Sequence, residues 1–223
     1  GGALAKATTF SFETPPPTVV SEYPTDGPYH LDVPMFLMFD QKIDPAKVLA
    51  KLKVTAGSQA YPLALLTAAE IEKDKVIKGL VEAAKKDEQD GRWLAFRSTL
   101  KFAPDTTIAL EVPVGTPSAE GPNLTKAAQT YAFRTYPPLK IEEAQCGWGS
   151  PCRPSMPFVI RFNNPLDADK FDAQQLTIEP AIAGLHVMNQ GTNLIVQGAT
   201  TPRTQYKVGV AAAKRRKGRV LAL

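Results

Sequence analysis

The sequence predicts an all-β protein made of two tandem immunoglobulin-like β-sandwich domains, the first with an inserted amphipathic helix. The first observation is a repeat. Residues 10–17 return as residues 131–138 at an offset of 121, and residues 34–44 return as residues 157–167 at an offset of 123. Two blocks in the same order at nearly the same offset indicate two copies of one module. The second observation is that 20 prolines recur between short apolar runs, which is typical of a β protein with many turns.

The first domain is expected to cover residues 1–136 and to contain six short strands. Residues 51–55 alternate polar and apolar side chains, as a half-buried strand does, and the proline-rich stretch 21–28 predicts a loop. The strands are expected at residues 18–20, 35–39, 51–55, 93–96, 107–112 and 131–135.

One segment of the first domain predicts a helix near residues 67–86. Thr67-Ala68-Ala69-Glu70 is a capping-box sequence, and Ile77, Leu80, Val81 and Ala84 follow at helical spacing. Its polar side is rich in Glu, Lys and Asp. Two interpretations are open. The helix is either a protruding element that contacts a partner or, as we favour, a cover over one open end of the sandwich.

The second domain is expected to cover residues 137–213. Six strands are expected at residues 139–141, 158–162, 176–178, 185–187, 193–196 and 206–210, a spacing that suits an immunoglobulin-type sandwich. No strand follows to match residues 131–133 of the first domain, so this sandwich is expected to be incomplete. Truncation of a longer protein and a changed reading frame would both produce this. The chain is therefore expected to be an excerpt of something longer.

The charge distribution argues against a nucleic-acid partner. The net charge of +4 depends on residues 214–223, a basic tail expected to be disordered, which carries five positive charges against a body at −1. A phosphate-binding domain would spread its basic residues over a folded face. No apolar run approaches the roughly 20 residues that span a bilayer, so no transmembrane segment is expected.

Two cysteines, Cys146 and Cys152, flank a short Gly- and Pro-containing segment that can double back on itself. A disulfide between them would stabilise the fold by roughly 2 kcal/mol and would indicate an oxidising compartment. The alternative is a pair of reduced cysteines in a turn. Structural zinc is disfavoured, because the chain has two histidines and neither forms a ligand cluster with this pair.

Catalysis finds little support, and the chain is expected to be no enzyme and to need no cofactor. The sequence contains no Gly-x-Ser-x-Gly turn, phosphate-binding glycine loop or His-Glu-x-x-His helix. His30 and His186 are each expected to be surface or packed residues rather than general bases.

Two acidic pairs follow strands at matching places in the two domains: Asp40 with Asp44, and Asp167 with Asp169. Clustered carboxylates can bind calcium. We favour the alternative, in which these short polar side chains stabilise the turn that leaves the strand, and expect no metal site.

Trp148 lies between two glycines in the loop that the cysteines flank. An exposed tryptophan there could contact sugars or proteins, while a buried one would close the end of its own sandwich.

The repeated motifs resemble those of a known family. Phe-x-Thr-x-x-Pro leading into a strand, followed by Phe-x-Phe-Asp/Asn-x-x-Ile/Leu-Asp, resembles the immunoglobulin-like modules near the N-terminus of bacterial alpha-2-macroglobulin-like proteins. The second copy is most similar, through residues 134–141, the Cys-Gly-Trp-Gly of residues 146–149, and residues 162–167. The resemblance covers roughly residues 10–210.

This resemblance implies a location in the bacterial cell envelope, periplasmic or surface-exposed, within a string of domains that traps proteases. Many members carry a thioester built from Cys-x-Glu-Gln. Here residues 146–149 lack the Glu-Gln, which rules out covalent capture by that route. No bait region can be identified in the sequence either. The expected role is therefore a non-catalytic scaffold. Its expected partners are the other domains of the parent protein and proteases, and a monomeric state is expected.

Two other functions remain open from the sequence. One is a cell-surface adhesion or carbohydrate-binding module that uses the Trp148 loop or the helix near residues 67–86 as its contact. The other is a hydrolase with a site in a cleft between the two domains. Consecutive prolines in the linker, residues 136–138, restrict the backbone and predict a limited range of angles between the domains.

Overall fold

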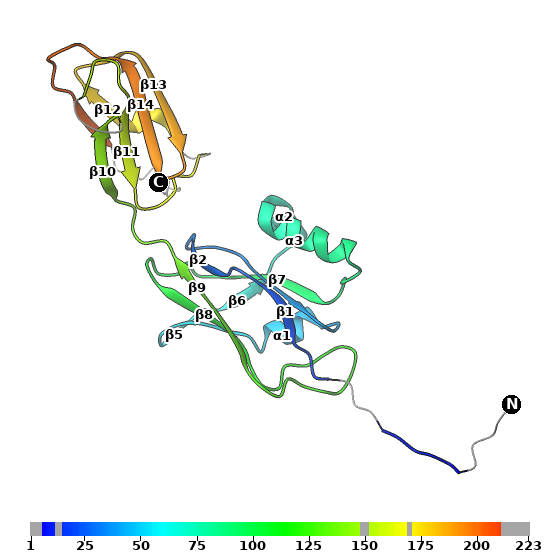
Figure 1. The fold of residues 1–223 in the computed structure, drawn as a ribbon. Coiled ribbons are helices and arrows are strands. Elements are labelled where there is room, and N and C mark those ends of the chain that lie inside the picture. The colour runs from blue at the N-terminus through cyan, green and yellow to red at the C-terminus, as the bar shows by residue number, and fades with distance from the viewer. Residues whose placement is uncertain (1–5, 12–14, 148–151, 169–170, 211–223) are drawn as a thin grey trace. The chain divides into compact units, whose positions relative to one another are not determined.

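The computed structural model describes residues 6–11, 15–147, 152–168 and 171–210, and most of its regular structure is β-strand (Figure 1). The prediction of an all-β fold is confirmed at the level of class. The chain divides into two compact units, Gly1–Tyr136 and Pro137–Leu223, which are described separately below as unit 1 and unit 2.

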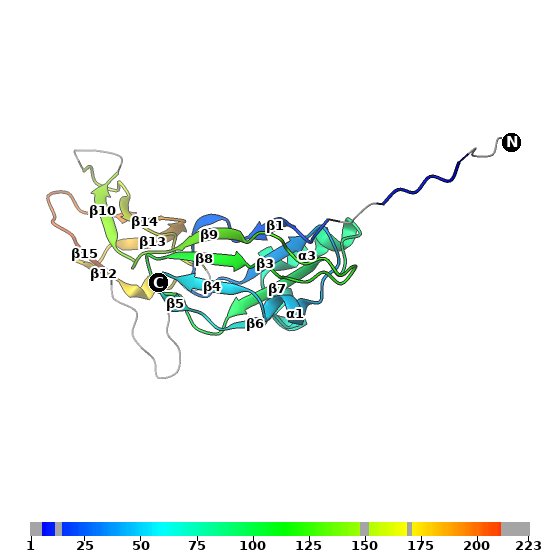
Figure 2. The ribbon, with the colours of Figure 1, turned by 90° about the horizontal axis from the view of Figure 1, so that it is seen from below.

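Unit 1 contains two sheets. One is four-stranded and antiparallel, in the order β1 (Val19–Tyr23), β3 (Met35–Phe39), β7 (Trp93–Ser98), β6 (Leu63–Leu65). The other is five-stranded, in the order β2 (Asp26–Tyr29), β9 (Gln129–Thr135), β8 (Thr107–Val112), β4 (Lys53–Ala56), β5 (Gln59–Ala60), and its strands β9, β8 and β4 lie side by side in Figure 2. The pair β2–β9 is parallel, and the other pairs are antiparallel.

The core of unit 1 lies between these two sheets. The alternation of side chains along strand β8 explains why the core forms between the sheets. Ile108, Leu110 and Val112 are all buried and alternate with more exposed residues. They pack against inward-facing residues of the opposite sheet such as Met35 and Phe39, and a short helix, α1 (Pro45–Leu49), adds Val48.

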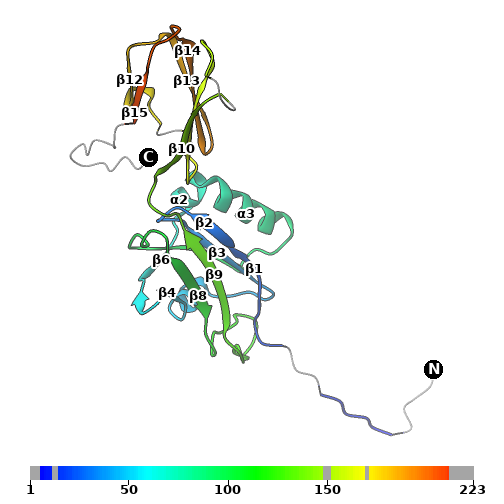
Figure 3. The ribbon, with the colours of Figure 1, turned by 60° about the vertical axis from the view of Figure 1, so that its left-hand side comes forward.

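Strand β3 has the sequence Met-Phe-Leu-Met-Phe without a polar residue, because both of its faces are covered. Met35, Leu37 and Phe39 face the main core, whereas Phe36 packs with Ile77 and Val81 of a helix on the outer face. Figure 3 shows this helix, α3 (Lys75–Lys86), on the side of the sheet away from β8 and β9. The expected position over an open end of the sandwich is therefore wrong, because the apolar stripe of the helix matches the outer face of β3 and β7.

The single helix expected near residues 67–86 is two helices, α2 (Ala68–Lys73) and α3. The capping box is present, with Glu70 N–H donating to Thr67 Oγ1 and Thr67 N–H donating to the Glu70 carboxylate. Asp74 separates the two helices, since its backbone is extended while its carboxylate accepts hydrogen bonds from Val76 N and Ile77 N, both at 3.0 Å.

Unit 2 contains a four-stranded antiparallel sheet in the order β10 (Ile141–Cys146), β11 (Phe158–Phe162), β14 (Asn193–Ala199), β13 (Ala183–Gln190). A two-stranded sheet, β12 (Leu176–Glu179) with β15 (Lys207–Val210), lies opposite it (Figure 3), and a 3-10 turn, η1 (Ala173–Gln175), precedes β12. Its buried core is small: Ile160, Phe162, Leu166, Leu176, Leu194 and Val196.

Candidate functional site

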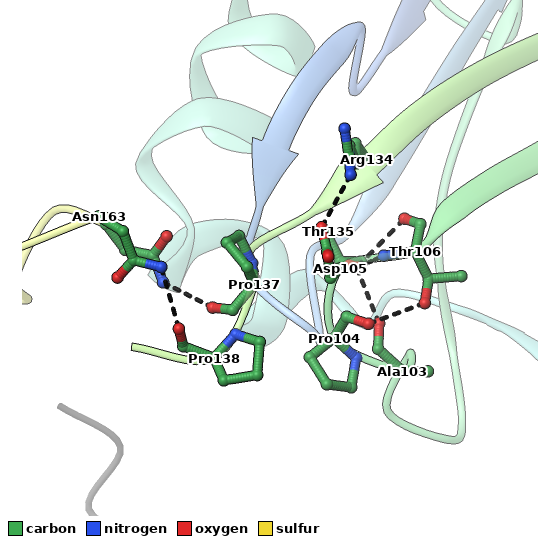
Figure 4. A network of polar contacts seen from close by, with 10 residues as sticks. Ala103, Pro104, Asp105, Thr106, Arg134, Thr135, Pro137, Pro138 and Asn163 are labelled. Atoms are coloured by element: carbon green, nitrogen blue, oxygen red, sulfur yellow. Dashed lines mark hydrogen bonds and ion pairs between the residues drawn. The ribbon is translucent and has the colours of Figure 1, made fainter. Parts of the chain in front are cut away.

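Hydrogen bonds within each unit hold the chain on both sides of the boundary between the two units, and Figure 4 shows some of these polar contacts. On the unit 1 side, Thr135 at the end of β9 is fully buried. Its hydroxyl donates to Ala103 O at 2.8 Å and accepts from Thr106 N at 2.9 Å. The next residue, Tyr136, donates its N–H to Tyr29 O at 2.8 Å. Hydrogen bonds within unit 1 therefore hold the backbone up to Tyr136, the last residue of the unit.

On the unit 2 side, two asparagines hold the prolines that begin the unit (Figure 4). Asn163 Nδ2 donates to Pro138 O at 3.0 Å, and Asn164 Nδ2 donates to Pro137 O at 2.6 Å. Asn163 Oδ1 also accepts from Lys140 N at 2.8 Å. Because proline has no N–H, its carbonyl is the backbone group available for such anchoring. Hydrogen bonds within unit 2 thus hold the backbone from Pro137, the first residue of the unit, onward.

The sequence placed these residues within the repeated blocks without assigning them a role. Thr135 closes the first repeated block, and Asn163 and Asn164 lie in the second. The repeat did single out this position, because Thr14 of the first copy corresponds to Thr135 of the second. The partners Ala103 and Thr106 are about thirty residues away, and only the folded chain brings them to Thr135.

The expected disulfide is present, since Cys146 and Cys152 are bonded to each other. Gly147, with a φ of 61°, turns the chain directly after β10, and a Cβ at this position would collide with the side chain of Met156. With its sulfur in the disulfide, Cys146 offers no thiol for a thioester. Trp148, the residue expected to make contacts, lies outside the described residues.

An open pocket of about 460 Å³ lies next to the disulfide. The loop at residues 200–206 forms one wall, and Cys152, Arg153 and Phe158 form another. The loop is held in place because Thr201 N–H donates to the Tyr206 hydroxyl at 2.7 Å. The pocket combines apolar and polar side chains with two cations, Arg153 and Arg203, a chemistry that suits a protein or sugar contact better than a reaction.

The two histidines lie in different units. His30 follows β2 and meets the ring of Tyr136 edge-on at a centroid distance of 5.4 Å, and burial raises the pKa of the Tyr136 phenol. His186 is an exposed residue of β13.

The first acidic pair serves local structure. Asp40 Oδ1 accepts from Thr18 N at 2.8 Å, and Asp44 caps α1 by accepting from Ala46 N and Lys47 N. The N–H of Lys47, above all, holds the pKa of the Asp44 carboxyl below its usual value. Within the part of the chain that the structure describes, no group of three or more His, Cys, Asp or Glu side chains could hold a metal ion. Asp169, of the second pair, lies outside that part.

Comparisons with known proteins give limited information. No family model matches the chain. An alignment over 169 residues, which covers 66% of this chain, is 26% identical to circularly permutated Ras protein 2 of Dictyostelium discoideum, and the match spans 4% of that protein's length. Among solved structures, the N-terminal part of the bacterial S-layer protein SbsC is similar with a TM-score of 0.36 and 9% identity, over 83% of this chain and 44% of that one.

Among the helices that the structure describes, none combines the length and the apolar character that spanning a bilayer requires.

Proposed function

We propose that the chain is a pair of non-catalytic immunoglobulin-like modules that act as a structural spacer in a larger extracytoplasmic protein. The observation that carries the proposal is the strand order of unit 1. In immunoglobulin-type sandwiches, strands A, B, E and D form one sheet and strands C, F and G the other. Unit 1 has the order β1-β3-β7-β6 facing β2-β9-β8-β4-β5, which corresponds to A-B-E-D facing A′-G-F-C-C′.

Unit 2 supports the same assignment in part. Its sheet β10-β11-β14-β13 corresponds to A-B-E-D, and its pair β12–β15 corresponds to C and F. The residues of unit 2 that the structure describes end with strand F.

The larger protein is proposed to be a bacterial alpha-2-macroglobulin-like protease trap of the cell envelope. Support comes from the motif similarity of residues 134–141 and 162–167 and from the Cys146–Cys152 disulfide, which belongs in an oxidising compartment. In this assignment the two modules position other domains of the parent and do not react with the protease.

The spacer role depends on the linker, and small-angle scattering at low protein concentration tests it. Each unit fixes the chain up to the Tyr136–Pro137 bond, so we expect a narrow distribution of separations between the units. Replacing both Pro137 and Pro138 by glycine should broaden it. The matched control is Pro122→Gly, in a loop of unit 1 away from the linker. A distribution already broad in the unchanged chain would rule out the spacer.

A second function, adhesion, is favoured by one observation: the open pocket beside the Cys146–Cys152 disulfide, the two cysteines that flank Trp148 in the sequence. Binding of the chain to glycan arrays or matrix proteins, lost in Trp148→Ala and retained in Trp93→Phe, would move this function ahead of the spacer.

A further inference from the structure

The open pocket beside the Cys146–Cys152 disulfide has a lining whose charges are all of one sign. Its volume of about 460 Å³ is large enough for a small ligand. Arg153 and Arg203 line it, and none of the described residues that line it is Asp or Glu. The lining therefore contributes two positive charges and no negative charge.

Neither guanidinium of this pocket is neutralised by a carboxylate of the described residues. Arg161, on β11 of the same unit, shows the contrasting case, because its guanidinium forms ion pairs with Glu142 and Glu143 at 3.8 and 3.1 Å. Arg153 and Arg203 have no ion pair of this kind within the described part of the chain. A guanidinium presents a planar set of N–H donors that matches two oxygens of an anion. The two arginines are therefore open to an anion from outside the chain.

The wall that carries Arg153 is a closed turn. Met156 N–H donates to Arg153 O at 3.2 Å, and Arg153 N–H donates to Met156 Sδ at 3.3 Å. The preceding residue, Cys152, is bonded to Cys146 at the end of β10. The backbone at Arg153 is thus held on one side by the disulfide and on the other by the turn.

The wall that carries Arg203 is the loop at residues 200–206. Its first residue, Thr200, accepts a hydrogen bond at Oγ1 from Ser155 N at 2.7 Å, which ties the loop to the turn of the other wall. The hydrogen bond from Thr201 N–H to the Tyr206 hydroxyl closes the loop on itself. Both walls are therefore held before a ligand arrives, and a held backbone loses little conformational freedom on binding.

The rest of the lining suits a ligand with many hydroxyl groups. The polar uncharged side chains of the described lining are those of Thr200, Thr201, Thr204, Gln205 and Tyr206. The Tyr206 hydroxyl accepts from Thr201 N, so its own proton can still be donated. The ring of Phe158 lies beside the Tyr206 ring, at a centroid distance of 6.2 Å, and adds an aromatic surface. Groups that both donate and accept, next to aromatic rings, match a sugar better than they match an acidic peptide, which would use the arginines alone.

We propose that this pocket binds an acidic sugar residue of a glycan, one that carries a carboxylate or a sulfate group, and that Arg153 and Arg203 contact the anion. Both groups offer a pair of oxygens to a guanidinium. The inference rests on the second function proposed above, adhesion, and names the chemical class of its ligand. It uses only residues of unit 2 and does not depend on the spacer role.

Titration calorimetry with defined oligosaccharides tests the ligand class. The unchanged chain is titrated with an oligosaccharide of galacturonic acid and with the methyl ester of the same oligosaccharide, both at low ionic strength. If the carboxylate is recognised, the free acid should bind with a Kd below about 1 mM and the ester at least about tenfold more weakly, since the ester keeps the sugar and removes the charge. Added salt should weaken the binding of the acid, because exposed charges are screened.

A second pair of ligands distinguishes the two anions. It consists of a galactose oligosaccharide that carries sulfate groups and no carboxylate, and of its desulfated form. If sulfate is recognised, the sulfated form should bind at least about tenfold more tightly than the desulfated form. An excess of this size in either pair supports the proposal. Absence of binding by both acidic forms up to about 1 mM, or equal binding of acidic and neutral forms in both pairs, would overturn it.

Single substitutions locate the site on the chain. Arg153→Gln and Arg203→Gln should each raise the Kd of the acidic oligosaccharide that binds at least about tenfold, because each removes a charged donor from the anion. The matched control is Arg161→Gln, the same change of side chain and of net charge in the same unit but outside the pocket, and it should stay within about twofold. Both pocket arginines are exposed, so circular dichroism should show an unchanged fold. The same loss in all three variants would mean that net charge alone attracts the ligand, which contradicts the proposal.

A peptide of glutamate residues tests the other source of carboxylates. At equal charge it should bind at least about tenfold more weakly than the acidic oligosaccharide. Equal or tighter binding would make an acidic protein segment the occupant in place of a glycan. Binding of neutral glycans or matrix proteins that is unaffected in Arg153→Gln and Arg203→Gln would leave adhesion standing and refute this ligand, so the two fail separately.

Discussion

Thr135 shows how one side chain fixes the end of a strand. Its hydroxyl accepts a hydrogen bond from the N–H of Thr106 and donates one to the carbonyl of Ala103, next to the point where unit 1 ends. Buried backbone groups that lose such a partner carry their full desolvation cost.

The first prediction concerns this hydroxyl. Thr135→Val keeps the shape of the side chain and removes both hydrogen bonds, so it should lower the free energy of unfolding of unit 1 by about 1–3 kcal/mol. Urea denaturation followed by the fluorescence of Trp93, in a background with Trp148→Phe so that unit 1 alone is reported, measures the change. Thr130→Val, an exposed position of the same strand, is the control and should be within about 0.5 kcal/mol of the unchanged chain. Equal effects of the two substitutions would refute the role of the hydroxyl.

At the scale of elements, the helices α2 and α3 are attached to their sheet in two ways. Ile77 and Val81 pack on Phe36 and Ala95, and Glu70 of the capping box forms an ion pair with Arg97 of β7 at 3.0 Å. The N–H of Thr67, above all, holds the pKa of the Glu70 carboxyl below its usual value, and its hydroxyl and Arg97 act in the same direction. The cap therefore joins the start of α2 to the strand beneath it.

The second prediction concerns the break between the helices. Asp74→Ala removes the acceptor for Val76 N and Ile77 N and should destabilise unit 1 by about 1 kcal/mol. Asp74→Asn keeps an oxygen acceptor and should cost less than half as much. Thermal unfolding followed by circular dichroism at 222 nm measures both. A loss that is the same for Ala and Asn would mean that charge, and not the cap, is what matters at this position.

At the scale of the molecule, each unit has a core of its own, and the two cores differ in size. Unit 1 has a main core between its sheets and a second one under α3, whereas the core cluster in the described part of unit 2 has six buried residues. Free energy from burial grows with the apolar area removed from water, so unit 2 should be the less stable of the two.

The third prediction follows from this difference. Calorimetry should resolve two transitions, and reduction of Cys146–Cys152 should shift only the lower one, by a loss of about 2 kcal/mol. The chain has no other cysteines, so the reductant acts on this bridge alone. A double Cys→Ser variant should reproduce the shift without reductant. One cooperative transition, or a shift of the upper one, would contradict the assignment.

Local signals in the sequence account for the elements that were predicted well. The alternation at residues 107–112 and the apolar run at residues 35–39 each specify a strand, and both are present. The capping box marks the start of α2 to the residue. Three strands escaped prediction. β2 (Asp26–Tyr29) overlaps the stretch 21–28 that was wrongly expected to be a loop, because its Gly27 and Pro28 are residues typical of turns. β5 (Gln59–Ala60) and β6 (Leu63–Leu65) have only two and three residues, too few to show a period.

By itself the sequence determined that the chain is all-β, that a helix interrupts the first module and that Cys146 and Cys152 are near enough to bond, because each of these depends on residues close together along the chain. Only the tertiary structure decided which face the helix covers, which backbone groups Thr135 satisfies and that Arg153 and Arg203 line one pocket. These depend on segments that are tens of residues apart, and their pairing is settled by burial and hydrogen bonding across the whole fold rather than by local pattern.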